Sequence, residues 1–200
     1  MKKLFCIALA LCLVFALAAC GEAESETSPT PNYDGVTPSD LLGPTPEPTP
    51  TPEPQPVQLL SVNGVNLVSN GQLTNIGFKG FSYADGVLTV TDVTLQSSDS
   101  SKPIIAWDGG DLEIVISGTV TLESSGGIPA ISGGSNALTL SGDGTLTVNA
   151  ADAAAFDVTG SLTVGCVLNA AGAPAFSGST VTAAEGHSVT ANDGTTLSVA

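Results

Sequence analysis

The side chains around position 108 combine the residue types and spacing best suited to binding chemistry. Asp108 and Asp111 are separated by two glycines, Glu113 follows, and Trp107, the chain's one tryptophan, stands immediately before them. A hard cation such as Ca²⁺ takes several oxygen ligands from a flexible turn, so the three acids are candidate calcium ligands. Asp-Gly pairs also make tight corners without any metal, because Asp bonds its own backbone and Gly accepts positive φ. Both interpretations stay open.

Trp107 itself has two interpretations. An aromatic ring beside polar acceptors suits stacking on a sugar, which makes Trp107 a candidate carbohydrate-binding residue. The alternative is that Trp107 packs in the core. Its exposure therefore separates a polysaccharide-binding module, which needs an open ring face, from a structural or adhesive scaffold.

The N-terminal segment has the organisation of an export signal. Lys2 and Lys3 precede an apolar run over residues 4–16, which is too short for a comfortable membrane span. The following Leu17-Ala-Ala-Cys20 resembles the lipobox of bacterial lipoproteins. That resemblance implies that residues 1–19 are a signal peptide and that Cys20 carries a diacylglyceryl group and palmitate. The protein would then be anchored to the extracytoplasmic face of a bacterial cell membrane. The alternative is an ordinary secretory signal.

A different composition follows in residues 20–56. Glutamates, threonines and alternating prolines predominate, as in Pro44-Thr-Pro-Glu-Pro-Thr-Pro-Thr-Pro-Glu-Pro54. Such a segment cannot bury enough apolar surface to fold, and its prolines favour an extended polyproline II spacer. The sequence therefore predicts a disordered tether ahead of a folded domain over residues 57–200.

Charge and cysteine content exclude several functions. The formal net charge is −15 and no arginine is present. Nucleic-acid binding is excluded, because phosphate contacts need Lys and Arg. An anionic polysaccharide would need a bridging cation. Once the signal peptide is removed and Cys20 is acylated, Cys166 is the remaining thiol and His187 the one histidine. We expect Cys166 to be a small buried hydrophobe and the protein not to be an enzyme.

Short alternating runs recur through the folded part. Those that begin at Val87, Leu112, Leu138 and Leu162 are about 24 to 26 residues apart, a spacing that indicates a solenoid. A second strand follows each first one, and Gly or Asp stands at the corners. The pattern predicts an all-β domain, namely a short right-handed parallel β-helix. An antiparallel sandwich is the rival fold.

A third repeated segment predicts which residues stack. One predicted column contains alanines and the next contains large apolar residues. If the large residues point inward, they form the core. If they point outward, they form a platform for sugar rings. The first column is Ala106, Ala130, Ala155 and Ala175, and the second is Trp107, Ile131, Phe156 and Phe176.

The segments Ile128-Pro-Ala-Ile-Ser-Gly-Gly134 and Leu138-Thr-Leu-Ser-Gly-Asp-Gly-Thr-Leu-Thr-Val148 resemble the pectate-lyase-like right-handed β-helices. They are most similar to carbohydrate-binding β-helical domains on the surface of clostridia and related bacteria. The resemblance covers roughly Val87 to Gly178. It implies polysaccharide as the partner. Enzymes of that superfamily use calcium-binding acids with an Arg or Lys base, and this chain lacks a matching base.

The C-terminal run Thr196–Val199 alternates like another first strand. Open strand edges invite pairing, and solenoids normally carry caps. We therefore expect the C-terminal coil to be the least stable part and to support self-association.

Overall fold

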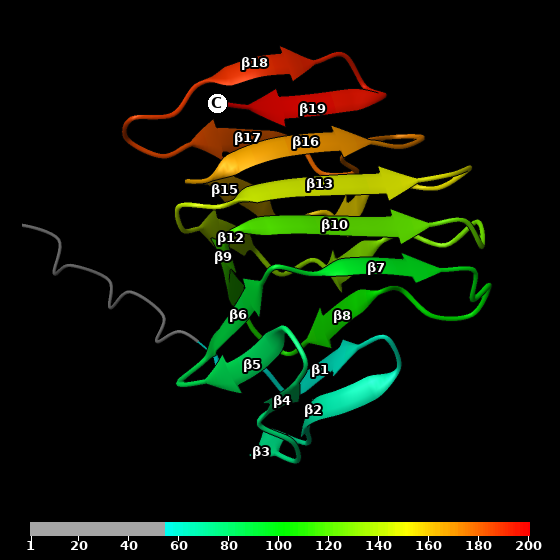
Figure 1. Ribbon diagram of the computed structural model, residues 1–200, viewed down its shortest axis with the longest axis vertical. Helices are drawn as coiled ribbons and strands as arrows, with labels where there is room; N and C mark the ends of the chain where they lie inside the picture. Colours follow the sequence, from blue (N-terminus) through cyan, green and yellow to red (C-terminus); the bar gives the residue numbers. More distant parts are fainter. Residues whose placement is uncertain (1–54) are drawn as a thin grey trace, which may run out of the picture. The chain divides into compact units, whose positions relative to one another are not determined.

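The computed structural model describes residues 55–200, in which all regular structure is β-strand. The predicted signal peptide, Cys20 and the tether through residue 54 lie outside the described residues. The strands form three sheets, and successive turns of the chain add one strand to each (Figure 1).

Sheet 1 contains the predicted first strands, which pair in parallel from β6 to β17. Two short N-terminal strands extend it in the antiparallel sense. Its members are β4 (Gly77–Phe78), β5 (Phe81–Ala84), β6 (Val87–Thr91), β9 (Leu112–Ser117), β12 (Leu138–Ser141), β15 (Ser161–Val164) and β17 (Thr180–Ala183).

Sheet 2 contains the predicted second strands and ends in a C-terminal hairpin. Its members are β7 (Thr94–Ser97), β10 (Thr119–Ser124), β13 (Thr145–Ala150), β16 (Val167–Ala171), β18 (Val189–Asn192) and β19 (Thr196–Val199). Sheet 3 contains the third strands, preceded by an N-terminal meander. Its members are β1 (Leu59–Val62), β2 (Val65–Ser69), β3 (Gln72–Leu73), β8 (Ile105–Asp108), β11 (Ile131–Gly134) and β14 (Phe156–Val158).

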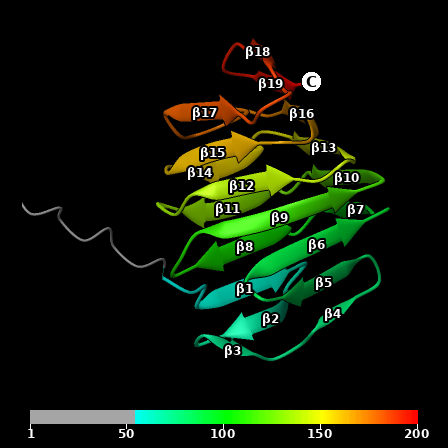
Figure 2. The same cartoon turned by 90° about the vertical axis from the view of Figure 1, so that its left-hand side faces the viewer.

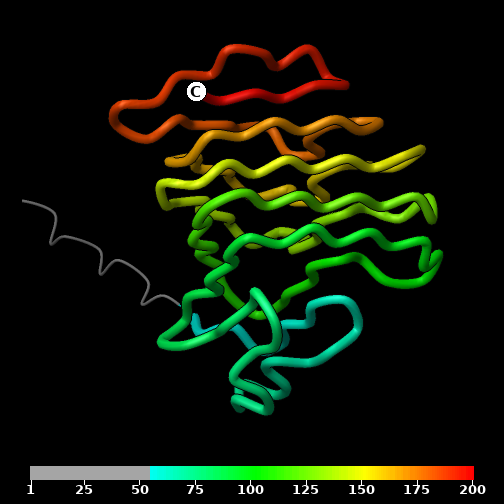
Figure 3. Tube along the Cα trace, viewed as in Figure 1, coloured from blue at the N-terminus to red at the C-terminus, as the bar shows by residue number. Residues whose placement is uncertain are grey.

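The parallel strands confirm a β-solenoid of about three turns. The turns are β6–β7–β8, β9–β10–β11 and β12–β13–β14, and they lie directly over one another (Figures 2 and 3). The predicted register holds for three strands of sheet 1, where Leu112 pairs with Leu138 and Leu138 with Leu162. It is off by one residue at β6, where Val87 pairs with Glu113 and not with Leu112. The predicted register also holds in sheet 2, where Leu122 lies between Leu95 and Val148.

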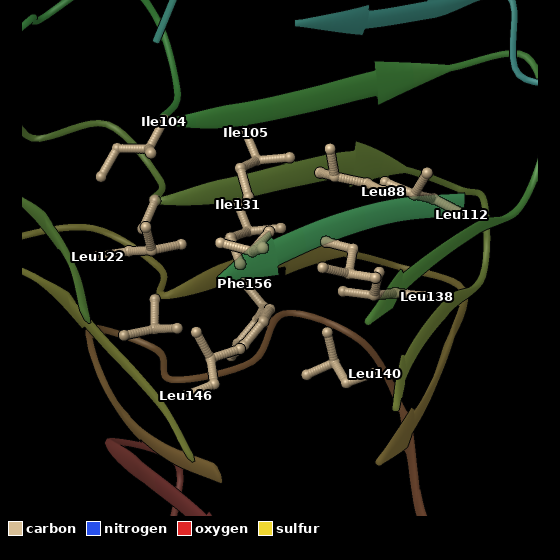
Figure 4. Close-up of a cluster of buried hydrophobic side chains, with 14 of the residues drawn as sticks. Leu88, Ile104, Ile105, Leu112, Leu122, Ile131, Leu138, Leu140, Leu146 and Phe156 are labelled. Atoms are coloured by element: carbon tan, nitrogen blue, oxygen red, sulfur yellow. The ribbon is translucent and has the colours of Figure 1, made fainter. Parts of the chain in front are cut away.

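The inward-facing side chains of the alternating strands fill the interior. Leucines of sheet 1, leucines of sheet 2 and the large residues of sheet 3 converge between the sheets (Figure 4). Each fully buried side chain of this size contributes about 1.5 to 3 kcal/mol. The residues labelled there, all at most 1% exposed, include Leu88, Ile105, Leu112, Leu122, Ile131, Leu138, Leu146 and Phe156.

In sheet 3, the pairing between β8 and β11 differs from the predicted one. Ile131 pairs with Ile105, not with Trp107, and Ser132 pairs with Ala106. The column is therefore Ile105, Ile131 and Phe156, which bridges to Phe176. Ala106 is not stacked on Ala130. Ile131 and Phe156 are fully buried, so this column is core and not a sugar platform.

Reversed strands cap both ends of the solenoid. At the N-terminal end β1 pairs antiparallel with β8, and β5 pairs antiparallel with β6. At the C-terminal end β19 pairs antiparallel with β16, and β18 covers β19. Thr196–Val199 is therefore not another first strand, because it lies in sheet 2 and runs in the opposite direction. Leu197 and Val199 fill the interior there and are 0% and 1% exposed.

Candidate functional site

Trp107 lies in the core, 3% exposed. Its indole N–H donates a hydrogen bond of 3.1 Å to the carbonyl of Gly110. The ring packs over Gly133 of the next turn, where a Cβ atom would stand 2.0 Å from the indole. Trp107 therefore exposes no ring face on which the predicted sugar could stack.

The three predicted calcium ligands make separate hydrogen bonds. Asp108 accepts from the backbone N–H of Gly109 at 2.8 Å, Asp111 from that of Ala137 at 2.8 Å, and Glu113 from the Ser141 hydroxyl at 2.8 Å. Within residues 55–200 no group of three or more His, Cys, Asp or Glu side chains could hold a metal ion. The acids thus do not form the single cluster that the sequence predicted.

Two of the corner acids link consecutive turns instead. Asp92 accepts a hydrogen bond of 3.0 Å from the backbone N–H of Thr119, which lies one turn further along the chain. Asp111 does the same for Ala137. Both hydrogen bonds are exposed to solvent, but a charged acceptor makes a stronger hydrogen bond than a neutral one. A charged acceptor at each corner therefore stabilises the stacking of the turns.

Cys166 has the properties of a core residue. Its side chain is 1% exposed, and burial raises the pKa of the thiol to about 11. The thiol therefore stays protonated at neutral pH, and a protonated thiol is a poor nucleophile.

A hollow of about 330 Å³ at the N-terminal end of the solenoid could receive a ligand. Its size is at the lower end of the range typical of small-molecule sites. One aromatic ring, one carboxylate and one amide line it together with apolar side chains. The residues used below are Gln55, Pro56, Val68, Leu73, Tyr83 and Asp111.

Local sequence explains how these side chains come together. Tyr83 is on β5, which a two-residue Asp85-Gly86 turn joins to β6; both turn residues have positive φ. Asp111 lies at the corner before β9. The chain enters the domain against Gly110, where a Cβ atom would stand 2.1 Å from the Gln55 carbonyl oxygen. The glycines beside Asp111 therefore give the entering chain room to close one side of the hollow.

Tyr83 and Asp111 provide complementary recognition chemistry. Tyr83 is half-buried, and this burial raises the pKa of its phenol, so the hydroxyl stays protonated and can donate a hydrogen bond. Asp111 is exposed and supplies acceptor oxygens. The Tyr83 ring can stack on a sugar ring while its hydroxyl and the Asp111 carboxylate hydrogen-bond the sugar hydroxyls.

The sequence prediction named Asp111 but missed Tyr83. The Asp85-Gly86 pair after Phe81-Ser-Tyr-Ala84 is a hairpin signal that could have placed Tyr83 on a strand. No local pattern shows that the entering chain and β2 face that strand.

Comparison of the chain with known protein families, with curated proteins and with solved structures gave no match. The resemblance to clostridial carbohydrate-binding β-helices and to lipoproteins therefore stays a prediction from sequence. Among residues 55–200 there is no helix long and apolar enough to cross a membrane.

Proposed function

We propose that this protein is a lipid-anchored surface module that binds uncharged polysaccharide without cleaving it. The hollow lined by Tyr83 and Asp111 carries the proposal, because it combines a partly open aromatic ring with hydrogen-bonding groups. The acidic charge of the chain disfavours an anionic polymer. The absence of arginine and the protonated, buried Cys166 thiol support a non-catalytic role.

A glycan array probed with the full chain, purified in detergent, tests this function. We expect binding to uncharged polysaccharides that does not depend on added calcium. Tyr83→Ala should lower the affinity roughly tenfold by removing the ring. Asp111→Asn should also weaken binding, while it keeps an acceptor for the Ala137 N–H. Tyr33→Ala, at the chain's other tyrosine, is the matched control and should leave binding unchanged.

A structural or adhesive scaffold is the second candidate function. The burial of Trp107 and the use of Asp92 and Asp111 as links between turns favour it. A scaffold should bind none of the arrayed glycans. Full retention of affinity in Tyr83→Ala would instead show that the sugar binds outside the hollow.

The surface location rests on Cys20 and the residues before it. Acylation of this cysteine supplies two chains, and two chains suffice to hold a protein on a membrane. In a bacterial host, Cys20→Ala should leave unprocessed precursor and abolish labelling by radioactive palmitate. Persistent labelling of the Cys20→Ala protein would contradict the anchor.

A further inference from the structure

The outer face of sheet 2 has an uninterrupted row of uncharged hydrogen-bonding side chains. Successive members pair directly across five neighbouring strands, β7, β10, β13, β16 and β19 (Figure 1). Each is exposed or half-buried, and neighbouring strands lie about 4.8 Å apart. This sheet 2 row is Thr94, Thr121, Thr147, Asn169 and Ser198.

The corresponding outer row of sheet 1 is less uniform. It begins with Val87 and Glu113, and Glu113 is already bonded to Ser141. Three threonines then follow at Thr139, Thr163 and Thr182. Sheet 2 therefore offers the longer regular array of hydroxyl and amide groups.

A second hollow, of about 200 Å³, lies at the N-terminal end of the sheet 2 row. Thr94 is a member of the row and also lines this hollow. The ring of Phe78 is half-buried and rests on Phe81, with centroids 5.2 Å apart and the planes tilted by 36°. Phe81 is 4% exposed, so Phe78 is the accessible ring. Lys79 and Asp92 also line the hollow, which gives it charges of both signs.

We propose that the sheet 2 row is a binding track for one extended, uncharged, equatorially linked polysaccharide, with a terminal sugar against Phe78. This inference rests on the proposed function and adds a second site, on the outer face of sheet 2, to the hollow at Tyr83. Each hydroxyl or amide of the row can donate and accept hydrogen bonds, as sugar hydroxyls do. An equatorially linked pyranose chain advances by about one strand spacing per sugar, so one sugar faces each strand.

The regular spacing has a consequence for affinity. A periodic ligand on a periodic surface gains contacts with each added unit, until the array ends. Affinity should therefore rise with chain length up to about one sugar per strand of the row. A single pocket would instead saturate after one or two sugars.

Calorimetric titration of the full chain in detergent with β-1,4-linked glucose oligosaccharides of increasing length tests the track. Thr147→Val keeps the β-branched shape and removes one central hydroxyl. It should weaken binding of the longest oligosaccharide roughly three- to tenfold, the value of one hydrogen bond, and leave the disaccharide unaffected. Thr139→Val on sheet 1, an equally half-buried outward threonine, is the matched control and should change neither.

The outcomes separate this inference from the proposed function. A rise in affinity with length that Thr147→Val reduces and Thr139→Val does not would support the track. Binding that is independent of length, or equally weakened by both variants, would overturn the track and leave sugar binding at Tyr83 intact. No binding to any oligosaccharide would overturn the track, and an array without a hit would overturn the proposed function as well.

Discussion

At the residue scale, the position of Trp107 depends on a glycine in the following turn. Gly133 faces inward, and a side chain there would overlap the indole ring. The large residue of one turn is thus matched by the smallest residue of the next. This pairing explains why Ile105, and not Trp107, lies opposite Ile131.

Gly133→Ala should destabilise the domain. The φ of Gly133 is not positive, so Ala fits the backbone, but its Cβ would lie 2.0 Å from the indole. Overpacking of this kind costs about 1 to 3 kcal/mol. Urea unfolding followed by fluorescence measures it, and the emission of the native state should shift because Trp107 is the one tryptophan.

Gly165→Ala is the control for that substitution. A Cβ there would meet the Ala184 side chain at 3.2 Å and no aromatic ring. The free energy of unfolding should fall less, and the native emission should stay unchanged. Equal losses in the two variants would mean that the indole moves aside at little cost.

At the element scale, the strands that the sequence predicted best are those with strict alternation. Leu112, Leu138 and Leu162 recur with outward polar neighbours, so both the strands and their register follow from period-two patterning. The third strand was misaligned because Ala106-Trp107 before Asp-Gly-Gly was matched to Ala130-Ile131 before Ser-Gly-Gly. Volume decides that position, and volume complementarity between turns has no local signature.

The caps had local signals that periodicity did not capture. Asn63-Gly64, Asn70-Gly71 and Asp85-Gly86 are two-residue hairpin turns in which both residues have positive φ. They make β1–β2–β3 and β5–β6 antiparallel. Which turn of the solenoid these hairpins cover depends on long-range packing. For the same reason the hollow at Tyr83 could not be predicted, although Asp111 could be identified as a polar corner.

The β18–β19 hairpin should lose stability in acid. Asp193 accepts hydrogen bonds from the Thr196 hydroxyl and from the backbone N–H groups of Thr196 and Thr195. These bonds lower the pKa of Asp193 below its ordinary value of 3.8. Its contribution is therefore fully present above that pH and is lost as the pH falls toward the folded-state pKa.

Hydrogen exchange of the β18–β19 amides at pH 7 and pH 3 measures this loss. Wild type should lose part of its protection at pH 3, which lies below the ordinary carboxyl pKa of 3.8 and above the lowered folded-state pKa. Asp193→Asn should be weakly protected at both pH values. Asp143→Asn, in another exposed Asp-Gly turn that has no such hydrogen bonds within the described residues, should behave like wild type. Protection in Asp193→Asn equal to that of wild type at pH 7 would show that the carboxylate contributes nothing.

At the scale of the whole molecule, the ends of the sheets determine how copies can meet. The sequence predicted self-association through the C-terminal coil around Val199. Val199 is buried and β18 covers its strand, so Val199 itself is not an open edge. β17 is the outer strand of sheet 1 and pairs with β15 on one side. It carries no charge or proline, the usual devices that protect an edge.

Association through β17 should appear in light scattering of the full chain in detergent and increase with salt. Salt screens the electrostatic repulsion between two acidic copies, and the Debye length is about 10 Å at 0.1 M ionic strength. Thr182→Lys places a charge on the edge and should reduce the dimer several-fold, because edge lysines oppose strand pairing. Thr190→Lys on β18, whose pairing with β19 is irregular, is the control and should leave the dimer unchanged. A protein that stays monomeric at high concentration and high salt, or that responds equally to both lysines, would show that β17 is not the contact.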